Sequence, residues 1–152
     1  MNSVLDALRE VDDPEYPGVS IVDLGLLEDV RDDGTTVTVD LIPTMSGCPA
    51  LRFIERDVTD AATAAIERDG LARRVEVRFL PTPVWTPDRI TGTARQLLAT
   101  EFTVAIRTSR RDATCPVCGG TELEEKSAFG PTPCRSVNWC ASCRNPIEVV
   151  RR

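Results

Sequence analysis

Cys115-Pro116-Val117-Cys118 and Cys140-Ala141-Ser142-Cys143 are the stretches that decide the fold of the C-terminal part of this chain. Each Cys-x-x-Cys pair can form a tight turn that points two thiolates at one place, and the 21 residues between the pairs are enough for a short sheet. Four thiolates brought together in this way make a tetrahedral metal site. We therefore predict a four-cysteine, metal-binding module over residues 115–152.

Zinc is the metal that the four-cysteine pattern favours, because Zn²⁺ accepts four sulfur ligands in tetrahedral geometry and needs no redox support. Iron, free thiols and disulfides are the alternatives. Cys134 lies between the two pairs and is either an additional ligand, if iron or a cluster is bound, or a small buried apolar side chain. The predicted metal ligands are Cys115, Cys118, Cys140 and Cys143.

The composition predicts a cytoplasmic protein whose partners are other proteins. The 152 residues are 41% hydrophobic and 28% charged, and no apolar run is long enough for a transmembrane helix. The N-terminus does not have the features of a secretory signal, so we expect reduced cysteines. The net charge of −6 disfavours binding to phosphate backbones. We expect neither membrane association nor nucleic-acid binding.

No catalytic constellation is evident in the sequence. The chain contains no histidine, so histidine-based acid–base chemistry and histidine metal ligation are excluded. It also has no phosphate-cradling glycine loop and no cofactor fingerprint. Cys48 could serve as a nucleophile, but no histidine is present to act as its base. We therefore expect a protein that is not an enzyme.

The residues before the cysteine module have the pattern of an α+β domain over residues 1–106. Asp32-Asp33-Gly34-Thr35 predicts a hairpin turn between strands at 27–31 and 36–41. The apolar spacing predicts a long helix from about Pro49, a suitable first helical residue, to residue 68, packed on the hairpin. A short helix over residues 3–11 with Ser3 as N-cap and a strand over residues 75–79 complete this part.

The segment between the α+β pattern and the cysteines is less regular. Thr86 and Pro87 predict the start of one helix that runs to about residue 99, and Trp85 is expected to anchor the loop before it. Residues 102–106 are a candidate strand, and the polar residues 107–114 are a predicted linker. Within the module, short strands are expected in residues 122–129 and 137–150.

Cys48 is the cysteine that lies outside the C-terminal module. Gly47 before it permits an unusual backbone, and Pro49 after it is expected to start the helix, whose positive end favours the thiolate. Cys48 is therefore either a metal-transferring thiol or a capping cysteine buried under the loop. Asp13, Glu15 and Asp23 are expected on loops near the start of the fold. They could join Cys48 in binding iron transiently, or could simply solvate a face or cap a turn.

Several segments of the sequence together resemble a known family. Three segments are similar to the SufT-like domain of iron–sulfur assembly proteins, namely Asp13-Pro14-Glu15, Val22-Asp23-Leu24-Gly25-Leu26 and Ser46-Gly47-Cys48-Pro49. With Pro83-Val84-Trp85-Thr86 and the segments from Cys115 to Cys143 added in that order, nearly the whole chain resembles the PaaD family.

The resemblance implies a small helix-packed SufT-like β-sheet domain joined to a zinc-ribbon-like module. It implies an accessory role in phenylacetate degradation, as a maturation factor that delivers iron or an iron–sulfur cluster to a multicomponent phenylacetyl-CoA epoxidase. The implied partners are the oxygenase and reductase subunits and iron–sulfur assembly proteins. By position, the candidate transfer site is Cys48 with Asp13, Glu15 and Asp23, the metal ligands are the four module cysteines, and Cys134 is the family's additional cysteine.

Two other functions fit the same residues. The chain could be a structural adaptor that holds oxygenase and reductase together and binds no metal beyond its own zinc. It could also be a nucleic-acid-binding zinc ribbon, for which the best feature is the arginines at 107, 110 and 111, although the net charge argues against it.

Overall fold

The computed structural model describes residues 1–150 and divides the chain into two compact units. The first unit comprises Met1–Trp85, and the second begins at Thr86 and includes all of the C-terminal module. The predicted domain division into residues 1–106, 107–114 and 115–152 stays a prediction.

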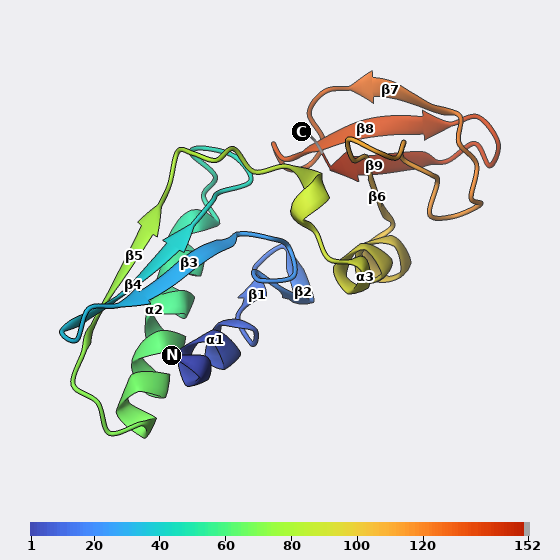
Figure 1. The fold of residues 1–152 in the computed structure, drawn as a ribbon. Helices are drawn as coiled ribbons and strands as arrows, with labels where there is room; N and C mark the ends of the chain where they lie inside the picture. Colours follow the sequence, from blue (N-terminus) through green and yellow to red (C-terminus); the bar gives the residue numbers. More distant parts are fainter. Residues whose placement is uncertain (151–152) are drawn as a thin grey trace. The chain divides into compact units, whose positions relative to one another are not determined.

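The first unit is a three-stranded sheet covered by helices (Figure 1). In order, its elements are α1 (Asn2–Leu8), β1 (Asp12–Asp13), β2 (Tyr16–Ser20), β3 (Leu27–Asp32), β4 (Thr36–Leu41), α2 (Leu51–Arg68) and β5 (Arg74–Phe79). Strands β3 and β4 form an antiparallel hairpin, and β5 pairs in parallel with β4, so that α2 is the crossover connection between β4 and β5. The short strands β1 and β2 form a separate antiparallel pair.

The predicted hairpin is confirmed, and Asp33 explains why it turns where it does. The Asp33 carboxylate accepts hydrogen bonds from the backbone N–H groups of Thr35 and Thr36, both at 2.8 Å. These bonds, with the Thr35 hydroxyl, lower the pKa of Asp33 to about 2. Gly34 takes a φ of +94°, a conformation that a residue with a Cβ rarely adopts.

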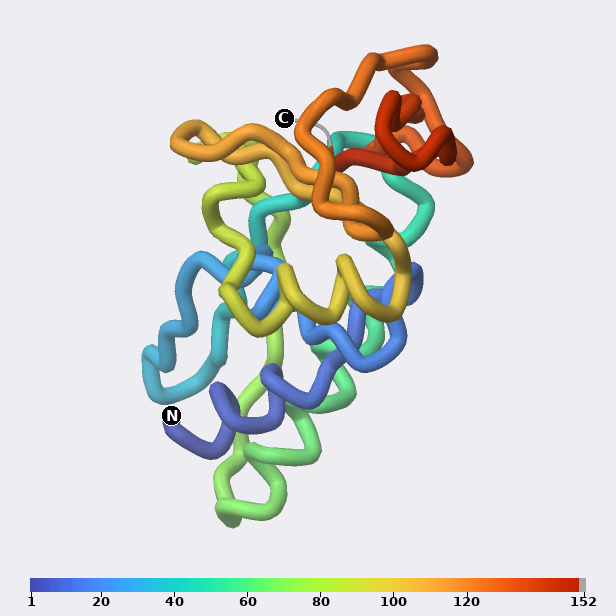
Figure 2. The backbone as a smooth tube through the Cα atoms, turned by 90° about the vertical axis from the view of Figure 1, so that its right-hand side faces the viewer, coloured from blue at the N-terminus to red at the C-terminus, as the bar shows by residue number. Residues whose placement is uncertain are grey.

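The long predicted helix is confirmed as α2, with one difference at its start. The helix begins at Leu51 with Ala50 as N-cap, so Pro49 is not its first residue, because residues 45–50 are occupied by turns that include Gly47 at a φ of +78°. Its buried face packs on β5 and α1, and Figure 2 shows α1 lying along α2. The buried residues of α2 are Ile54, Val58, Ala62, Ala65 and Ile66.

Ser3 does not cap the first helix as predicted. Met1 is the N-cap residue of α1 and makes no side-chain cap. The Ser3 hydroxyl instead donates to the carboxylate of Asp69, just beyond the end of α2. The side chain therefore ties α1 to α2 by donating its hydroxyl proton, whereas an N-cap serine would accept a hydrogen bond from a backbone N–H.

The outer face of the sheet carries a buried carboxylate that sequence reasoning missed. Asp40 on β4 is 2% exposed and lies beside Arg78 of β5 in the parallel register. Arg78 donates to both Asp40 oxygens, at 2.8 and 3.1 Å, and Arg31 of β3 donates at 2.6 Å. The Arg78 hydrogen bonds and the Arg31 charge hold the pKa of Asp40 below its usual value against the opposing effect of burial. This cluster links all three strands.

The second unit combines a helix with a four-stranded sheet in the order β6-β9-β8-β7. Its elements are η1 (Pro87–Arg89, a 3₁₀ turn), α3 (Gly92–Phe102), β6 (Val104–Ile106), β7 (Leu123–Ser127), β8 (Arg135–Cys140) and β9 (Pro146–Val150). Strand β6 pairs in parallel with β9, and β7, β8 and β9 pair antiparallel in turn. The predicted strands of the module and the candidate strand near residue 104 are confirmed.

The single helix predicted from residue 87 to about residue 99 is wrong. The chain forms η1, leaves the helical conformation at Ile90, and starts α3 afresh after Thr91. The Thr91 side chain accepts a hydrogen bond from Ala94 N at 3.2 Å, so Thr91 is the real N-cap. Thr86 and Thr91 thus each precede a separate helical segment, η1 and α3.

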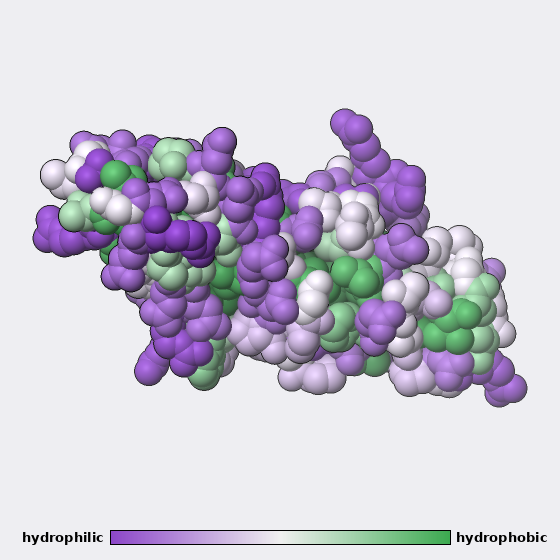
Figure 3. All heavy atoms as spheres, turned by 90° about the horizontal axis from the view of Figure 1, so that it is seen from below, coloured by the Kyte–Doolittle hydropathy of each residue, from purple (hydrophilic) through white to green (hydrophobic). Residues whose placement is uncertain are grey.

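Within residues 1–150, no helix has both the length and the apolar character needed to cross a lipid bilayer. Hydrophilic side chains predominate on the face drawn in Figure 3, and hydrophobic ones appear there in patches. The predicted α+β fold class is confirmed by the helices and mixed sheets of the two units.

Candidate metal centre

The four predicted ligands, Cys115, Cys118, Cys140 and Cys143, come together in the second unit. Their sulfur atoms all lie within 4.8 Å of one another. The Cys115–Cys143 and Cys118–Cys140 sulfur distances are both 3.6 Å. Four sulfurs placed 2.3 Å from a central zinc at tetrahedral angles would be about 3.8 Å apart. The donor set and its spacing therefore fit a zinc ion.

Two turns of the same construction position these thiols. In the first, Gly119 N donates to Cys115 O at 2.8 Å, and in the second, Arg144 N donates to Cys140 O at 2.9 Å. The residue after each pair is left-handed, with φ of +75° at Gly119 and +61° at Arg144. The first turn meets this requirement with glycine and the second with a strained arginine.

Burial differs among the four cysteines. Cys115 and Cys140 are buried at 2% and 0% exposure, Cys143 is half-buried and Cys118 is exposed. The two buried cysteines are members of the apolar core of the unit, beside Ile147 and Val149. The cluster therefore has one side in the core and one side toward the surface.

The surroundings of the two outer cysteines shift their acidity in opposite directions. A hydrogen bond from Gly120 N, at 3.4 Å, favours the Cys118 thiolate, but burial and the neighbouring thiols outweigh it and raise the pKa of Cys118 to about 11. The Asn145 side chain, aided by the neighbouring thiols and opposed by burial, lowers the pKa of Cys143 to about 6. Metal binding would displace the protons of these thiols.

Gly120 leaves room for the cluster, which gives a testable prediction. A Cβ at this position would lie 2.7 Å from Ser142 Oγ and 3.2 Å from Cys118 Sγ. Gly120→Ala is therefore expected to displace Cys118 and to lower the zinc affinity by roughly tenfold or more, the usual effect of disturbing groups just outside the ligands. Competition with a chromophoric chelator measures this affinity. Thr121→Ala, a change at the exposed neighbouring residue, is the control and should bind zinc as the unchanged protein does.

Cys134 lies outside the cluster. It precedes β8, is half-buried, and its sulfur lies 3.2 Å from the hydroxyl of Thr132. Within residues 1–150, the four cysteines are the only group of three or more metal-binding side chains close enough to hold an ion. The structure thus does not bring Cys134 to the four ligands, and its role as an additional ligand stays a prediction.

Cys48 lies in the turns between β4 and α2. Its thiol is partly accessible, and its carbonyl accepts a hydrogen bond from Leu51 N at 3.1 Å. It is two residues before the N-cap of α2, not at the cap itself. The interpretation of Cys48 as a fully buried capping residue therefore does not fit its exposure.

The three acids predicted to accompany Cys48 make local structural contacts. Asp13 is 8% exposed and accepts a hydrogen bond from Glu15 N at 2.8 Å. Asp23 accepts from the Ser20 hydroxyl at 3.2 Å, and its own N–H donates back to that hydroxyl at 3.0 Å. Among the described residues, these acids and Cys48 do not form a group of three ligands around one point. The transfer-site assignment stays a prediction.

Comparison with known proteins places the two units in two families. Residues 2–77 match the family model described as iron-sulfur cluster assembly protein, and residues 99–151 match the PaaD zinc beta ribbon domain. The combination defines a two-module class in which an assembly-type domain carries a zinc ribbon. Over 95% of its length the chain is 30% identical to an Escherichia coli (strain K12) protein that is named as a subunit of a "Putative 1,2-phenylacetyl-CoA epoxidase", and 88% of that protein is covered. The chain belongs to the PaaD family.

Solved structures resemble about two thirds of this chain. A domain of unknown function, DUF59, from Bacillus anthracis is 30% identical and has a TM-score of 0.58 over 65% of this chain and 91% of that one. A conserved hypothetical protein from Thermotoga maritima is 33% identical, with a TM-score of 0.48 over 62% of this chain and 89% of that one. The first of these supports the fold of the α+β unit.

Sequence reasoning missed the residues that shape the metal centre around its ligands. Gly120, Arg144 and Asn145 were not singled out, although each acts on a cluster cysteine or its turn. The signal for Gly120 is the Cys-Gly-Gly sequence at 118–120, in which one glycine supplies the left-handed turn and the next leaves space. Nothing in the sequence marked Arg144 as left-handed.

Proposed function

We propose that this chain is an accessory maturation factor for a phenylacetyl-CoA epoxidase, which holds or passes on iron or an iron–sulfur cluster through Cys48. The observation that carries the proposal is the partly accessible Cys48 thiol within the segment that matches the iron-sulfur cluster assembly family. The name of the Escherichia coli relative supports the client. We also propose that the protein acts in the cytoplasm and meets the oxygenase and reductase subunits and iron–sulfur assembly proteins there.

The two sulfur sites are proposed to have separate tasks. The four clustered cysteines would hold a resident zinc ion that stabilises the ribbon. Four thiolates fill the tetrahedral coordination sphere, so no position is open for exchanging a metal with another protein. Cys48 would bind its cargo as a single soft ligand. Its thiol loses a proton when iron binds and regains one when a ligand of the client replaces it, so the exchange needs no oxidant.

Nothing in the proposal requires catalysis by this chain. A thiol that exchanges a metal needs access and reversibility, and Cys48 is accessible without being embedded in a catalytic triad, since the chain has no histidine. Asp13 and Asp23 would act by holding the turns of the same unit, as the hydrogen bonds that their carboxylates accept indicate. The oxygenation chemistry would belong to the client.

The proposal is tested by replacing Cys48 in cells. In a strain that lacks this protein, Cys48→Ser is expected to leave epoxidase activity at the level of the deletion, because serine is a poor ligand for soft metals. The variant should still be folded and carry zinc. Ser46→Ala, an exposed change in the same turns, is the matched control and should restore activity. Full activity with Cys48→Ser would exclude the thiol from maturation.

A structural adaptor is the second candidate, because the Escherichia coli relative is named as one subunit of the epoxidase. The ribbon exposes large hydrophobic side chains that could contact other subunits, namely Val117, Phe129 and Trp139. Co-purification separates the two functions. An adaptor stays in the active epoxidase in equal proportion to its other subunits, whereas a maturation factor is absent from the active complex.

A further inference from the structure

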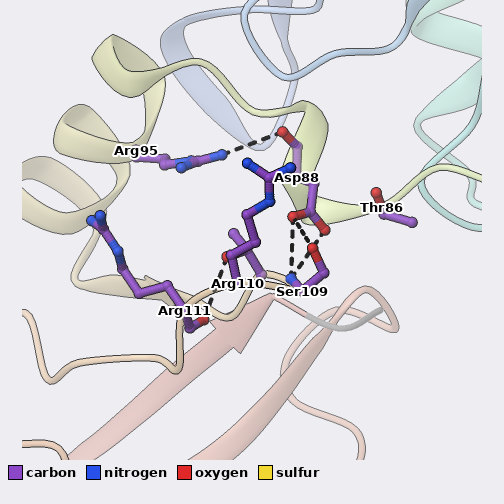
Figure 4. Close-up of a pocket in the computed structure, with 7 residues that line it drawn as sticks. Thr86, Asp88, Arg95, Ser109, Arg110 and Arg111 are labelled. Carbon is purple, nitrogen blue, oxygen red and sulfur yellow. Dashed lines mark hydrogen bonds between the residues drawn. The ribbon is translucent and has the colours of Figure 1, made fainter.

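The second unit contains a polar cavity of about 650 Å³ that the proposed function does not use. It lies between η1, the start of α3 and the turn at residues 108–111 (Figure 4). Three arginines line it together with hydroxyl side chains and one carboxylate. Its lining residues include Thr86, Asp88, Arg95, Ser109, Arg110 and Arg111.

The charge in this cavity is opposite to that of the chain. Three guanidinium groups face one carboxylate, although the chain as a whole has a net charge of −6. That carboxylate is already engaged, because Asp88 accepts hydrogen bonds from the Ser109 N–H at 3.1 Å and the Ser109 hydroxyl at 2.7 Å. Asp88 thus holds the turn against η1, and the cavity keeps an excess of positive charge.

The arginines of the cavity have N–H groups that could donate further hydrogen bonds to a ligand. Arg95 Nη2 donates to the Asp88 carbonyl at 3.3 Å, but its Nε is buried and has no hydrogen-bond partner among the described residues. A buried donor without a partner is costly, and an acceptor that entered the cavity would remove this cost. Arg110 and Arg111 are exposed and make no ion pair within residues 1–150. Figure 4 shows the Arg111 side chain extending toward α3 and the Arg110 side chain rising toward Asp88.

We propose that this arginine cavity binds the phosphate group of a phosphorylated small molecule. A phosphate group presents acceptor oxygens in several directions, and here guanidinium donors come from α3 on one side and from the 108–111 turn on the other. A carboxylate, with two oxygens in one plane, is satisfied by a single arginine. The volume is within the range of small-molecule sites.

Pyrophosphate is the probe for this proposal, titrated by calorimetry into the full-length zinc-loaded protein. The Arg110→Ala/Arg111→Ala double variant is expected to bind pyrophosphate about tenfold more weakly or worse, since charge-assisted hydrogen bonds are removed. Both residues are exposed, so the fold should be unaffected. Arg52→Ala, which removes the same kind of charge from an exposed site on α2, is the control and should bind within about twofold of the unchanged protein.

Two further titrations make the outcome decisive. Citrate should bind more weakly than pyrophosphate, and a single-stranded DNA oligonucleotide should not bind at physiological salt. The proposal is overturned if pyrophosphate does not saturate the protein, if Arg52→Ala loses as much affinity as the double variant, or if citrate binds equally well. Tight oligonucleotide binding that the double variant abolishes would instead assign the cavity to nucleic acid. None of these results depends on Cys48.

Discussion

Removing the metal from the four-cysteine cluster is expected to unfold the ribbon while the first unit stays folded. Among the described residues, the buried apolar cluster around the four cysteines has six members, and two of them, Cys115 and Cys140, are predicted ligands. A core of this size cannot offset the entropy of ordering the strands, so the metal has to supply the difference. Structural zinc contributes about 10–16 kcal/mol in comparable small modules.

Hydrogen exchange measured by mass spectrometry checks this expectation segment by segment. Cys140→Ala, or treatment with a strong chelator, should abolish protection in β7, β8 and β9 and leave α2 protected. Cys134→Ala is the matched control, because Cys134 lies outside the cluster, and it should keep both zinc and protection. A ribbon that remains protected after complete metal removal would show that zinc does not hold it.

Replacing Trp85 should strongly destabilise the first unit. Trp85 is 3% exposed, and its indole N–H donates to Leu24 O at 2.9 Å, in the loop that carries Asp23. Trp85→Ala is expected to lower the free energy of unfolding by about 3–5 kcal/mol through the cavity it leaves. Trp85→Phe keeps most of the ring volume and should lose about 1–3 kcal/mol, because the Leu24 carbonyl is left without this donor.

Urea unfolding followed by circular dichroism, with zinc in excess, measures both losses. Trp139→Ala is the matched control, since Trp139 is 36% exposed and should cost less than the buried tryptophan. If Trp85→Phe is as stable as the unchanged protein, the indole hydrogen bond contributes nothing. If Trp85→Ala costs no more than Trp139→Ala, Trp85 does not anchor the loop.

Local signals made much of the fold predictable. Asp33 and Gly34 indicate the β3–β4 turn by residue type, and the two Cys-x-x-Cys pairs indicate the cluster by spacing. Trp85 was expected to anchor its loop, and its hydrogen bond to Leu24 confirms this. The turn is indicated by adjacent residues, whereas the cysteines and Trp85 are residue types with few alternative uses, although the partner of Trp85, Leu24, is 61 residues away.

Features that depend on contacts distant in sequence were not predictable. Ser3 is a residue type that commonly caps helices, but its hydroxyl donates a hydrogen bond to Asp69, 66 residues away. Arg78 pairs with Asp40 only because β5 returns parallel to β4. The three arginines of the cavity appeared in the sequence as part of a polar linker and a helix, and only the fold of the second unit brings them to one site.

Elemental analysis of anaerobically purified protein, with its ultraviolet–visible spectrum, tests the separation of the two sulfur sites most directly. We predict one zinc per chain in both the unchanged protein and Cys48→Ser, with any iron or sulfide confined to the protein that retains Cys48. Iron and sulfide bound at the four clustered cysteines, or loss of zinc on replacing Cys48, would contradict this separation.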